Sequence, residues 1–299
     1  MKILCLGHST YDTIFPVTEY PKENTKTRYS VKSECAGGPS TTAAFLLAKW
    51  NMQVYMAGIV GNDHYGQRIK KDLALNRVNT DYLQVSDECS TSHSVGLANE
   101  VTGSRTLFIY NPKDTQMNDF ELDFEPDIIL IDGYEYEASK KVLKKYPKAI
   151  SIIDAGREKK EIIELAKMTS YVVCSKDFAE SLSEIKIDFE NKQTLVAIYQ
   201  KLETIFNNKI IVTLEEEGCL YRLDNKIKLM PAIKVKTVDS TGAGDIFHGT
   251  FTYALANGFD LEKALKYSNI AGALAVTKMG SYNAIPSLEE LEEVYEQIK

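Results

Sequence analysis

Up to about residue 214, short apolar runs alternate with amphipathic stretches along the chain. The amphipathic stretches have the length and apolar spacing of helices, at residues 40–50, 65–75, 137–146, 159–168 and 195–206. The apolar runs have the length of strands and are rich in Ile and Val, at residues 2–7, 53–60, 127–133, 149–155, 171–174 and 209–214. Strands that are apolar on both faces and alternate with helices are typical of a parallel sheet. We therefore predict a three-layer α/β/α fold with a mostly parallel central sheet.

Two segments break this alternation, at about residues 12–35 and 92–111. Each has β-prone residues on both sides of a turn-like centre and no helical spacing. We interpret them as hairpins that together form a small β lid, inserted in a single domain over residues 1–299, because no linker or repeat divides the chain. After Val238 the pattern is helical, with Asp260 and Ser287 at positions that favour helix N-caps.

The composition limits the class of protein and its setting. The net charge of −7 argues against nucleic acid as the main partner, since phosphate binding needs basic patches. The chain has no run of about 20 apolar residues to span a membrane, and its first residues lack a signal-peptide cleavage site. The five cysteines form no CxxC pair, and Cys174 is interpreted as a buried strand residue. Together these features predict a cytoplasmic protein with no membrane or nucleic-acid partner.

The stretch VDSTGAGDIFHGTF, residues 238–251, has the strongest chemical pattern. Gly242, Ala243 and Gly244 form a tight turn onto an expected helix, where unpaired amides and the helix dipole favour an anion such as phosphate. The turn is neither a Walker A loop nor a GxGxxG motif. Asp245 follows it at once. Phosphoryl transfer to an alcohol needs donors for the phosphoryl charge and a base for the hydroxyl proton. The alternative is that Asp245 is only a first-turn acid stabilised by the dipole.

The same stretch resembles the C-terminal signature of the PfkB/ribokinase family of carbohydrate kinases. Further segments resemble other family motifs in the same order: AGGPSTTAA at 36–44, GIVGNDHYG at 58–66, VTLEEEG at 212–218 and IAGALAVTKMGSYNAIPS at 270–287. The resemblance covers nearly the whole chain. It implies a ribokinase-like sheet with a β lid, and ATP-dependent phosphorylation of a small sugar, a ketose such as fructose or a ribose-like sugar.

The resemblance also implies roles for single residues on the sugar side. Asp245 is the expected general base, and the amides of Gly242, Ala243 and Gly244 are the expected anion hole. Other family positions imply contacts to the sugar from Asp12, Gly37, Gly38 and Thr42. Arg105 lies on a lid hairpin and is expected to reach the phosphates, as part of the substrate site, when the lid closes. The alternative for Asp12 is a turn-capping role, and for Arg105 a solvated hairpin charge.

On the nucleotide side, the resemblance implies ATP contacts from Ser175, Thr213, Gly218 and Asn269, with Mg²⁺ screening the phosphates. A K⁺ site is implied at Asp239 and Thr241, completed by carbonyl groups near Ala275, Lys278 and Gly280.

Three positions depart from the common family pattern. Thr42 stands where the Gly-Gly motif usually ends in Asn, and Ser175 and Phe178 replace the Asn and Glu of a motif tied to the magnesium–water network. Ketohexokinases show a similar SKD sequence and a hairpin similar to GSRT at 103–106. GGPSTTAA and GAGDIFHG are closer to sulfofructose-kinase-like members, for which Lys26 is a candidate sulfonate ligand. The branch within the family stays open.

Several other polar residues have structural interpretations. Asp63 is expected to cap the helix that begins near His64, and Lys26 and Arg28 to lie on an exposed strand face. His248 lies on nearly the same helix face as Asp245 and is expected to pack in the helix, while His8 ends the first strand.

Three other functions stay open. A kinase for a phosphorylated or sulfonated ketose would need a cation at the distal anion, and a nucleoside kinase would need an aromatic or apolar slot for the base. A regulator would bind these ligands without turnover. The lid edge also offers a surface for a homodimer, because exposed strand edges invite pairing.

Overall fold

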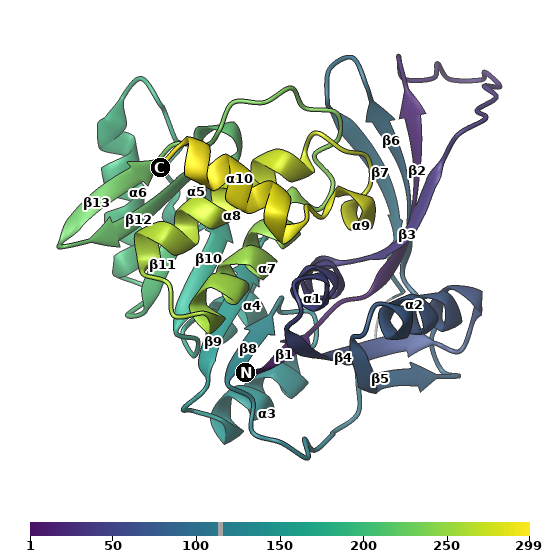
Figure 1. Cartoon of the computed structure of the whole chain (residues 1–299), viewed down its shortest axis with the longest axis horizontal. Helices are drawn as coiled ribbons and strands as arrows, with labels where there is room; N and C mark the ends of the chain where they lie inside the picture. Colours follow the sequence, from purple (N-terminus) through teal and green to yellow (C-terminus); the bar gives the residue numbers. More distant parts are fainter. Residues whose placement is uncertain (113–115) are drawn as a thin grey trace.

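The computed structural model describes residues 1–112 and 116–299, which form a central sheet of nine strands and a separate sheet of four (Figure 1). The central order is β13-β12-β11-β10-β9-β8-β1-β4-β5. Its parallel strands are β1 (Lys2–Leu6), β4 (Gln53–Gly61), β5 (Asn79–Ser86), β8 (Ile128–Ile131), β9 (Ile150–Ala155), β10 (Tyr171–Ser175) and β11 (Lys209–Thr213). The antiparallel strands β12 (Cys219–Leu223) and β13 (Lys226–Met230) complete one edge.

Helices cover both faces of the central sheet. They are α1 (Pro39–Lys49), α2 (His64–Leu75), α3 (Tyr136–Lys145), α4 (Lys160–Ala166), α5 (Lys176–Ser183), α6 (Lys192–Glu203), α7 (Ala243–Ala256), α8 (Leu261–Ala275), α9 (Ser281–Ala284) and α10 (Leu288–Gln297), with a 3-10 turn η1 (Glu215–Glu217). Two apolar clusters result, since successive residues of a strand point to opposite faces. In β1, Ile3 and Cys5 join the cluster of α1, α7 and α8, whereas Leu4 and Leu6 join that of α3 to α6. The predicted three-layer α/β/α fold is confirmed.

The local signals for helix starts are also confirmed. Asp63, Asp260 and Ser287 cap α2, α8 and α10 by accepting a hydrogen bond from a backbone N–H in the first turn. Strand β5 was not predicted, because an edge strand with an exposed face lacks the continuous apolar run of a buried strand.

The four-stranded sheet is the expected β lid, in the order β3-β2-β6-β7. Its strands are β2 (Thr10–Val17), β3 (Ser33–Gly37), β6 (His93–Asn99) and β7 (Arg105–Tyr110). The pairs β2–β3 and β6–β7 are antiparallel, and a parallel β2–β6 pairing joins them. The expectation for Lys26 and Arg28 was wrong: both lie in an exposed loop between β2 and β3, where polar residues around Pro21 lack the alternation of a strand.

Candidate active site

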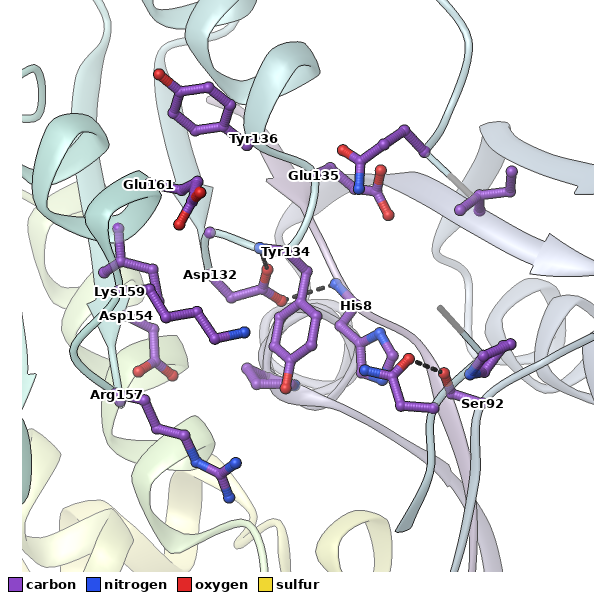
Figure 2. A pocket seen from close by; sticks show the side chains of 18 of the residues that line it. His8, Ser92, Asp132, Tyr134, Glu135, Tyr136, Asp154, Arg157, Lys159 and Glu161 are labelled. Atoms are coloured by element: carbon purple, nitrogen blue, oxygen red, sulfur yellow. Dashed lines mark hydrogen bonds between the residues drawn. The ribbon is translucent and has the colours of Figure 1, made fainter. Parts of the chain in front are cut away.

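A pocket of about 650 Å³ lies between the carboxyl edge of the central sheet and the lid (Figure 2). Ligands commonly bind at this edge in open α/β sheets. His8 follows β1, Asp132 follows β8, and Asp154 is the next-to-last residue of β9, so parallel strands bring these side chains together. Arg105 reaches the pocket from β7 and Asp245 from the first turn of α7.

The turn before Asp245 has the features of an anion site. Gly242 has a φ of 76°, and a Cβ atom there would lie 2.7 Å from the Cβ atom of Ser281, so both backbone and space require glycine. The backbone N–H groups of Gly242, Gly244 and Asp245 donate to no group in the described part of the chain. Free amides at the start of a 14-residue helix favour a bound anion.

The surroundings of Asp245 tune its carboxyl group. Enclosure in the protein raises its pKa to about 7, and the neighbouring carboxylate of Asp154 adds to this effect. His248 and Arg105 act in the opposite direction, and Asp12 adds a smaller upward effect. A base with a pKa near neutrality suits proton transfer from a hydroxyl group.

Sequence reasoning missed four acids that line the same pocket: Asp132, Asp154, Glu135 and Glu161. Asp132 accepts hydrogen bonds from the backbone N–H groups of His8 (2.8 Å) and Tyr134 (3.1 Å), and from the hydroxyl group of Ser40 (2.8 Å). Burial raises the pKa of Glu135 to about 7. The sequence pattern could have identified Asp132 and Asp154, because each stands at the carboxyl end of an apolar run. Asp12, which follows the first apolar run by a few residues, was chosen on a similar signal.

The predicted sugar residues lie close together beside the Gly242 turn. Asp12 is buried on β2 and accepts a hydrogen bond from the Ser94 hydroxyl (2.6 Å). Burial raises the pKa of Asp12. A side chain at Gly37 would overlap the Asp12 carboxylate and come within 3.3 Å of the Ser281 hydroxyl, and Ser281 also abuts Gly242. Ser281 therefore lies between the predicted sugar residues and the Gly242 turn.

Gly38 and Thr42 belong to the same region. A Cβ atom at Gly38, where φ is 97°, would lie 2.6 Å from the carbonyl oxygen of His8. Thr42 is fully buried on α1, and its hydroxyl group has no hydrogen-bond partner among the described residues. Its methyl group lies 3.8 Å from the position of a Cβ atom at Gly242.

The predicted nucleotide residues form a separate group around β10 to β13. Ser175 and Thr213 are register partners at the ends of β10 and β11. Ser175 caps α5, and the Thr213 hydroxyl donates to the Cys174 carbonyl (3.2 Å). Asn269 donates to the carbonyl groups of Met230 and Pro231, both at 3.4 Å, and a side chain at Gly218 would overlap the Met230 carbonyl.

The predicted metal positions fit unequally. Phe178 is completely buried, so the Ser175–Phe178 pair cannot hold a magnesium–water network, and the described residues contain no cluster of three or more His, Cys, Asp or Glu suited to a metal. At the K⁺ positions, Asp239 accepts from the N–H (2.9 Å) and hydroxyl (2.6 Å) of Thr241 and from Gly280 N–H (2.9 Å). The Asp239 carboxylate therefore links the segments at Thr241 and Gly280 through donors of the protein itself, without a cation. The Ala275 carbonyl, another expected K⁺ ligand, accepts from Lys278 N–H.

The remaining candidates divide between pocket and core. His8 lines the pocket and stacks on Tyr134, with ring centroids 4.2 Å apart. His248 is buried within α7, and Cys174 is completely buried in β10, as expected for both. Lys26 is not among the residues that line the pocket.

Comparisons with known proteins agree with this arrangement. The ribokinase of Bacillus subtilis (strain 168) is 29% identical over 98% of this chain and 99% of its own. A nucleoside kinase of Methanocaldococcus jannaschii is 26% identical over 99% and 97%. The crystal structure of a candidate ribokinase from Agrobacterium tumefaciens superposes with a TM-score of 0.90 at 26% identity, over 99% of this chain and 98% of that one. Within the described residues, no helix is long and apolar enough to cross a membrane. The family model described as "pfkB family carbohydrate kinase" matches residues 1–288, and the chain belongs to this family of carbohydrate kinases.

Proposed function

We propose that this protein transfers the γ-phosphate of ATP to a hydroxyl group of a small sugar, ribose-like or a ketose such as fructose. Asp245 is the general base, and the amides of the Gly242–Gly244 turn form the anion hole. The observation that supports this most is the free amides of that turn, followed directly by a carboxyl group that faces the pocket. The named ribokinase relative favours a ribose-like sugar among these acceptors.

The reaction follows from this geometry. The acceptor hydroxyl lies at Asp245, between Asp12 and Gly38. Its oxygen forms a bond to the γ-phosphorus as the bond from that phosphorus to the leaving ADP oxygen breaks, and the hydroxyl proton passes to Asp245. The free amides and Arg105 hold the charge of the transferring group.

ATP lies toward Ser175, Thr213, Gly218 and Asn269, with its γ-phosphate at the Gly242 turn. Magnesium, when bound with ATP, would screen the phosphate charges. We assign it no protein ligand, because Phe178 is buried and Ser175 already caps α5. The proposed setting is the cytoplasm, since Cys5, Cys35, Cys174 and Cys219 lie buried as thiols.

The direct test is Asp245→Asn, assayed by ADP release with a working sugar. Loss of general-base catalysis should lower kcat by about 10²–10⁴-fold. A loss below about tenfold would contradict the assignment. Asp63→Asn is the matched control, because Asp63 also begins a helix but lies outside the pocket lining, and it should leave kcat unchanged.

A second candidate is a sugar that carries a phosphate or sulfonate group. Arg157 and Lys159, both exposed, extend into the pocket from the segment after β9 (Figure 2). Neither forms an ion pair within the part of the chain that the structure describes. They replace Lys26 as candidate ligands for the distal anion. Arg157→Met should then lower kcat/KM for a ketose phosphate or sulfoketose by about tenfold or more and leave the neutral ketose unaffected.

A third candidate is a nucleoside, because Tyr134 presents a ring to the pocket while stacked on His8. A base could stack on that ring. One assay of ADP release over ketoses, aldoses, sugar phosphates, sulfosugars and nucleosides separates the three candidates. Tyr134→Ala should weaken nucleosides more than free sugars if a base binds there.

For the assembly, we propose a homodimer through the lid. Strand β7 is an edge strand, and its residues Phe108, Ile109 and Tyr110 are 66%, 56% and 48% exposed. An apolar edge with free backbone groups suits a second copy of the chain. Light scattering should give twice the chain mass, and Phe108→Lys should yield monomers. A monomeric parent protein at micromolar concentration would contradict the proposal.

A further inference from the structure

His248 lies one turn after Asp245 on α7 and is only 4% exposed. Its side chain has three close oxygen neighbours. Nδ1 lies 2.6 Å from the Gly244 carbonyl oxygen and 3.3 Å from a carboxylate oxygen of Asp154, and Nε2 lies 3.2 Å from the Val173 carbonyl oxygen.

These neighbours decide how the ring is protonated. Carbonyl and carboxylate oxygens accept hydrogen bonds and cannot donate them. A neutral imidazole has one nitrogen without a proton, and in either tautomer its lone pair would face an oxygen atom. Only the imidazolium has a donor on both nitrogens. Asp154 is close enough to balance its charge.

We propose that His248 is a buried imidazolium ion paired with Asp154, and that it is a positioning residue which keeps Asp245 ionised and fixes the anion-binding turn. The second part rests on the proposed function, whereas the protonation of the ring does not.

The charges around Asp245 give this cation a role. Asp154, at the end of β9, and Asp12, on β2, both disfavour its ionised form. Arg105 on β7 and His248 favour it. Burial raises the pKa of Asp154, and Asp132, after β8, adds to this effect, whereas His248 favours the ionised form of Asp154. Arg105 is exposed on the lid, whereas His248 is enclosed, where a charge is poorly screened by water.

The contact with Gly244 gives His248 a second role. By donating to the carbonyl group of Gly244, the ring restrains the peptide groups of the first helical turn. The N–H groups of Gly244 and Asp245 belong to this turn and are among the free donors of the anion hole. One side chain therefore supports both the base and the donors.

The first experiment observes the ring directly in the full-length protein. The chain has four histidines, at positions 8, 64, 93 and 248, so ¹⁵N-histidine labelling gives a spectrum that can be assigned. At pH 8, where an ordinary histidine is neutral, both ring nitrogens of His248 should carry protons. A ring with one protonated and one bare nitrogen would overturn the proposal. His248→Asn assigns the signal, and if it does not fold, variants of the other three histidines assign it by elimination.

The second experiment measures the pH dependence of kcat/KM. In the parent protein, activity should fall as the pH drops through about 7, because Asp245 becomes protonated. His248→Asn removes the cation, so the fall of kcat/KM on the acid side of the pH profile should move to higher pH by about one unit. This acid limb should shift in addition to any loss of the maximal kcat/KM at high pH. Thr250→Val is the matched control, since Thr250 is a buried, neutral residue of the same helix, and it should leave the limb in place.

The outcomes separate the two levels of the proposal. A limb that stays in place in His248→Asn, with a folded protein, would overturn the role toward Asp245. If Asp245→Asn keeps full activity, the proposed function fails, while the ring protonation measured at pH 8 still stands or falls alone.

Discussion

The carboxyl edge of the central sheet has two halves of different chemistry. The acceptor half, named for its proposed ligand, lies around Asp12, Asp132, Asp154, Asp245 and Arg105. Several of its carboxyl groups disfavour one another's ionisation. The nucleotide half, also named for its proposed ligand, lies around Ser175, Thr213, Gly218 and Asn269. These neutral residues form hydrogen bonds with the chain's own main chain or pack against it. The properties of the acceptor half thus depend on electrostatics, whereas those of the nucleotide half depend on the shape of the backbone. Substitutions should therefore act on catalysis in the first half and on stability and nucleotide affinity in the second.

Apart from Asp245→Asn, the largest effect should come from Gly242→Ala in the acceptor half. The added Cβ atom, 2.7 Å from the Cβ atom of Ser281, would displace the turn that holds the free amides. We expect kcat to fall at least about 100-fold, because small misplacements of reacting groups are costly.

The control for this variant is Gly258→Ala, at the other end of α7. Gly258 has a similar φ of 69°, but a Cβ atom there would meet nothing within 4 Å. Both variants carry the same backbone penalty of about 1–2 kcal/mol. Equal losses of kcat in the two would show that the position of the Gly242 turn does not matter.

A smaller effect should follow from Arg105→Met, which removes the lid cation near Asp12 and Asp245. We expect kcat/KM to fall by about tenfold, as for loss of a charged hydrogen bond. Steady-state kinetics with saturating ATP measure this. Arg28→Met removes an equal charge from the exposed loop of the lid, and a similar loss there would mean that only net charge counts.

In the nucleotide half, Asn269→Ala should act differently. It removes the donor to the carbonyl groups of Met230, which is half-buried, and Pro231, which is exposed, so we expect a loss of about 0.5–1.5 kcal/mol of unfolding free energy. The KM for ATP should rise by a few fold, while the KM for the sugar stays constant. Urea unfolding and kinetics together check this, and a change confined to the sugar KM would erase the distinction between the halves.

Asp245→Asn should also change the stability of the fold. The pKa of Asp245 is raised to about 7 in the folded protein, so its ionised form destabilises the fold as the pH rises from about 4 to 7. The variant should melt at a higher temperature than the parent at pH 8, and the difference should vanish near pH 4. A lower melting temperature at pH 8 would indicate that Asp245 is structurally stabilising.

The sequence was informative where the chemistry is local. Gly242 and Asp245 are near neighbours in the chain, so one stretch was enough to propose a joint role for them. Helix caps such as Asp63 depend on a single turn. The strands buried on both faces were equally clear. Edge strand β5 was missed because half of it faces solvent, and its polar residues conceal its apolar ones.

Other parts of the site could not be predicted because folding assembles them from distant segments. Asp132 and Asp154 are single acids at the ends of different strands, and only the β8–β9 pairing makes them neighbours. His248 was expected to be a packed helix residue, which it is, but its oxygen neighbours come from β9 and β10 as well as from α7. The prediction of a strand at Lys26 was wrong, because no strand of the described chain pairs with this segment.

The parallel β2–β6 pairing makes the lid a single mechanical unit. Asp12 lies on β2 and Arg105 on β7, yet continuous backbone hydrogen bonding through β6 links the two strands. Under the proposed function, a displacement that brings Asp12 onto the sugar also carries Arg105 toward the phosphate. Binding of the sugar and contact with the phosphate then occur together, which favours an ordered addition of substrates. When ATP binds without the sugar, it lacks its full set of charge partners.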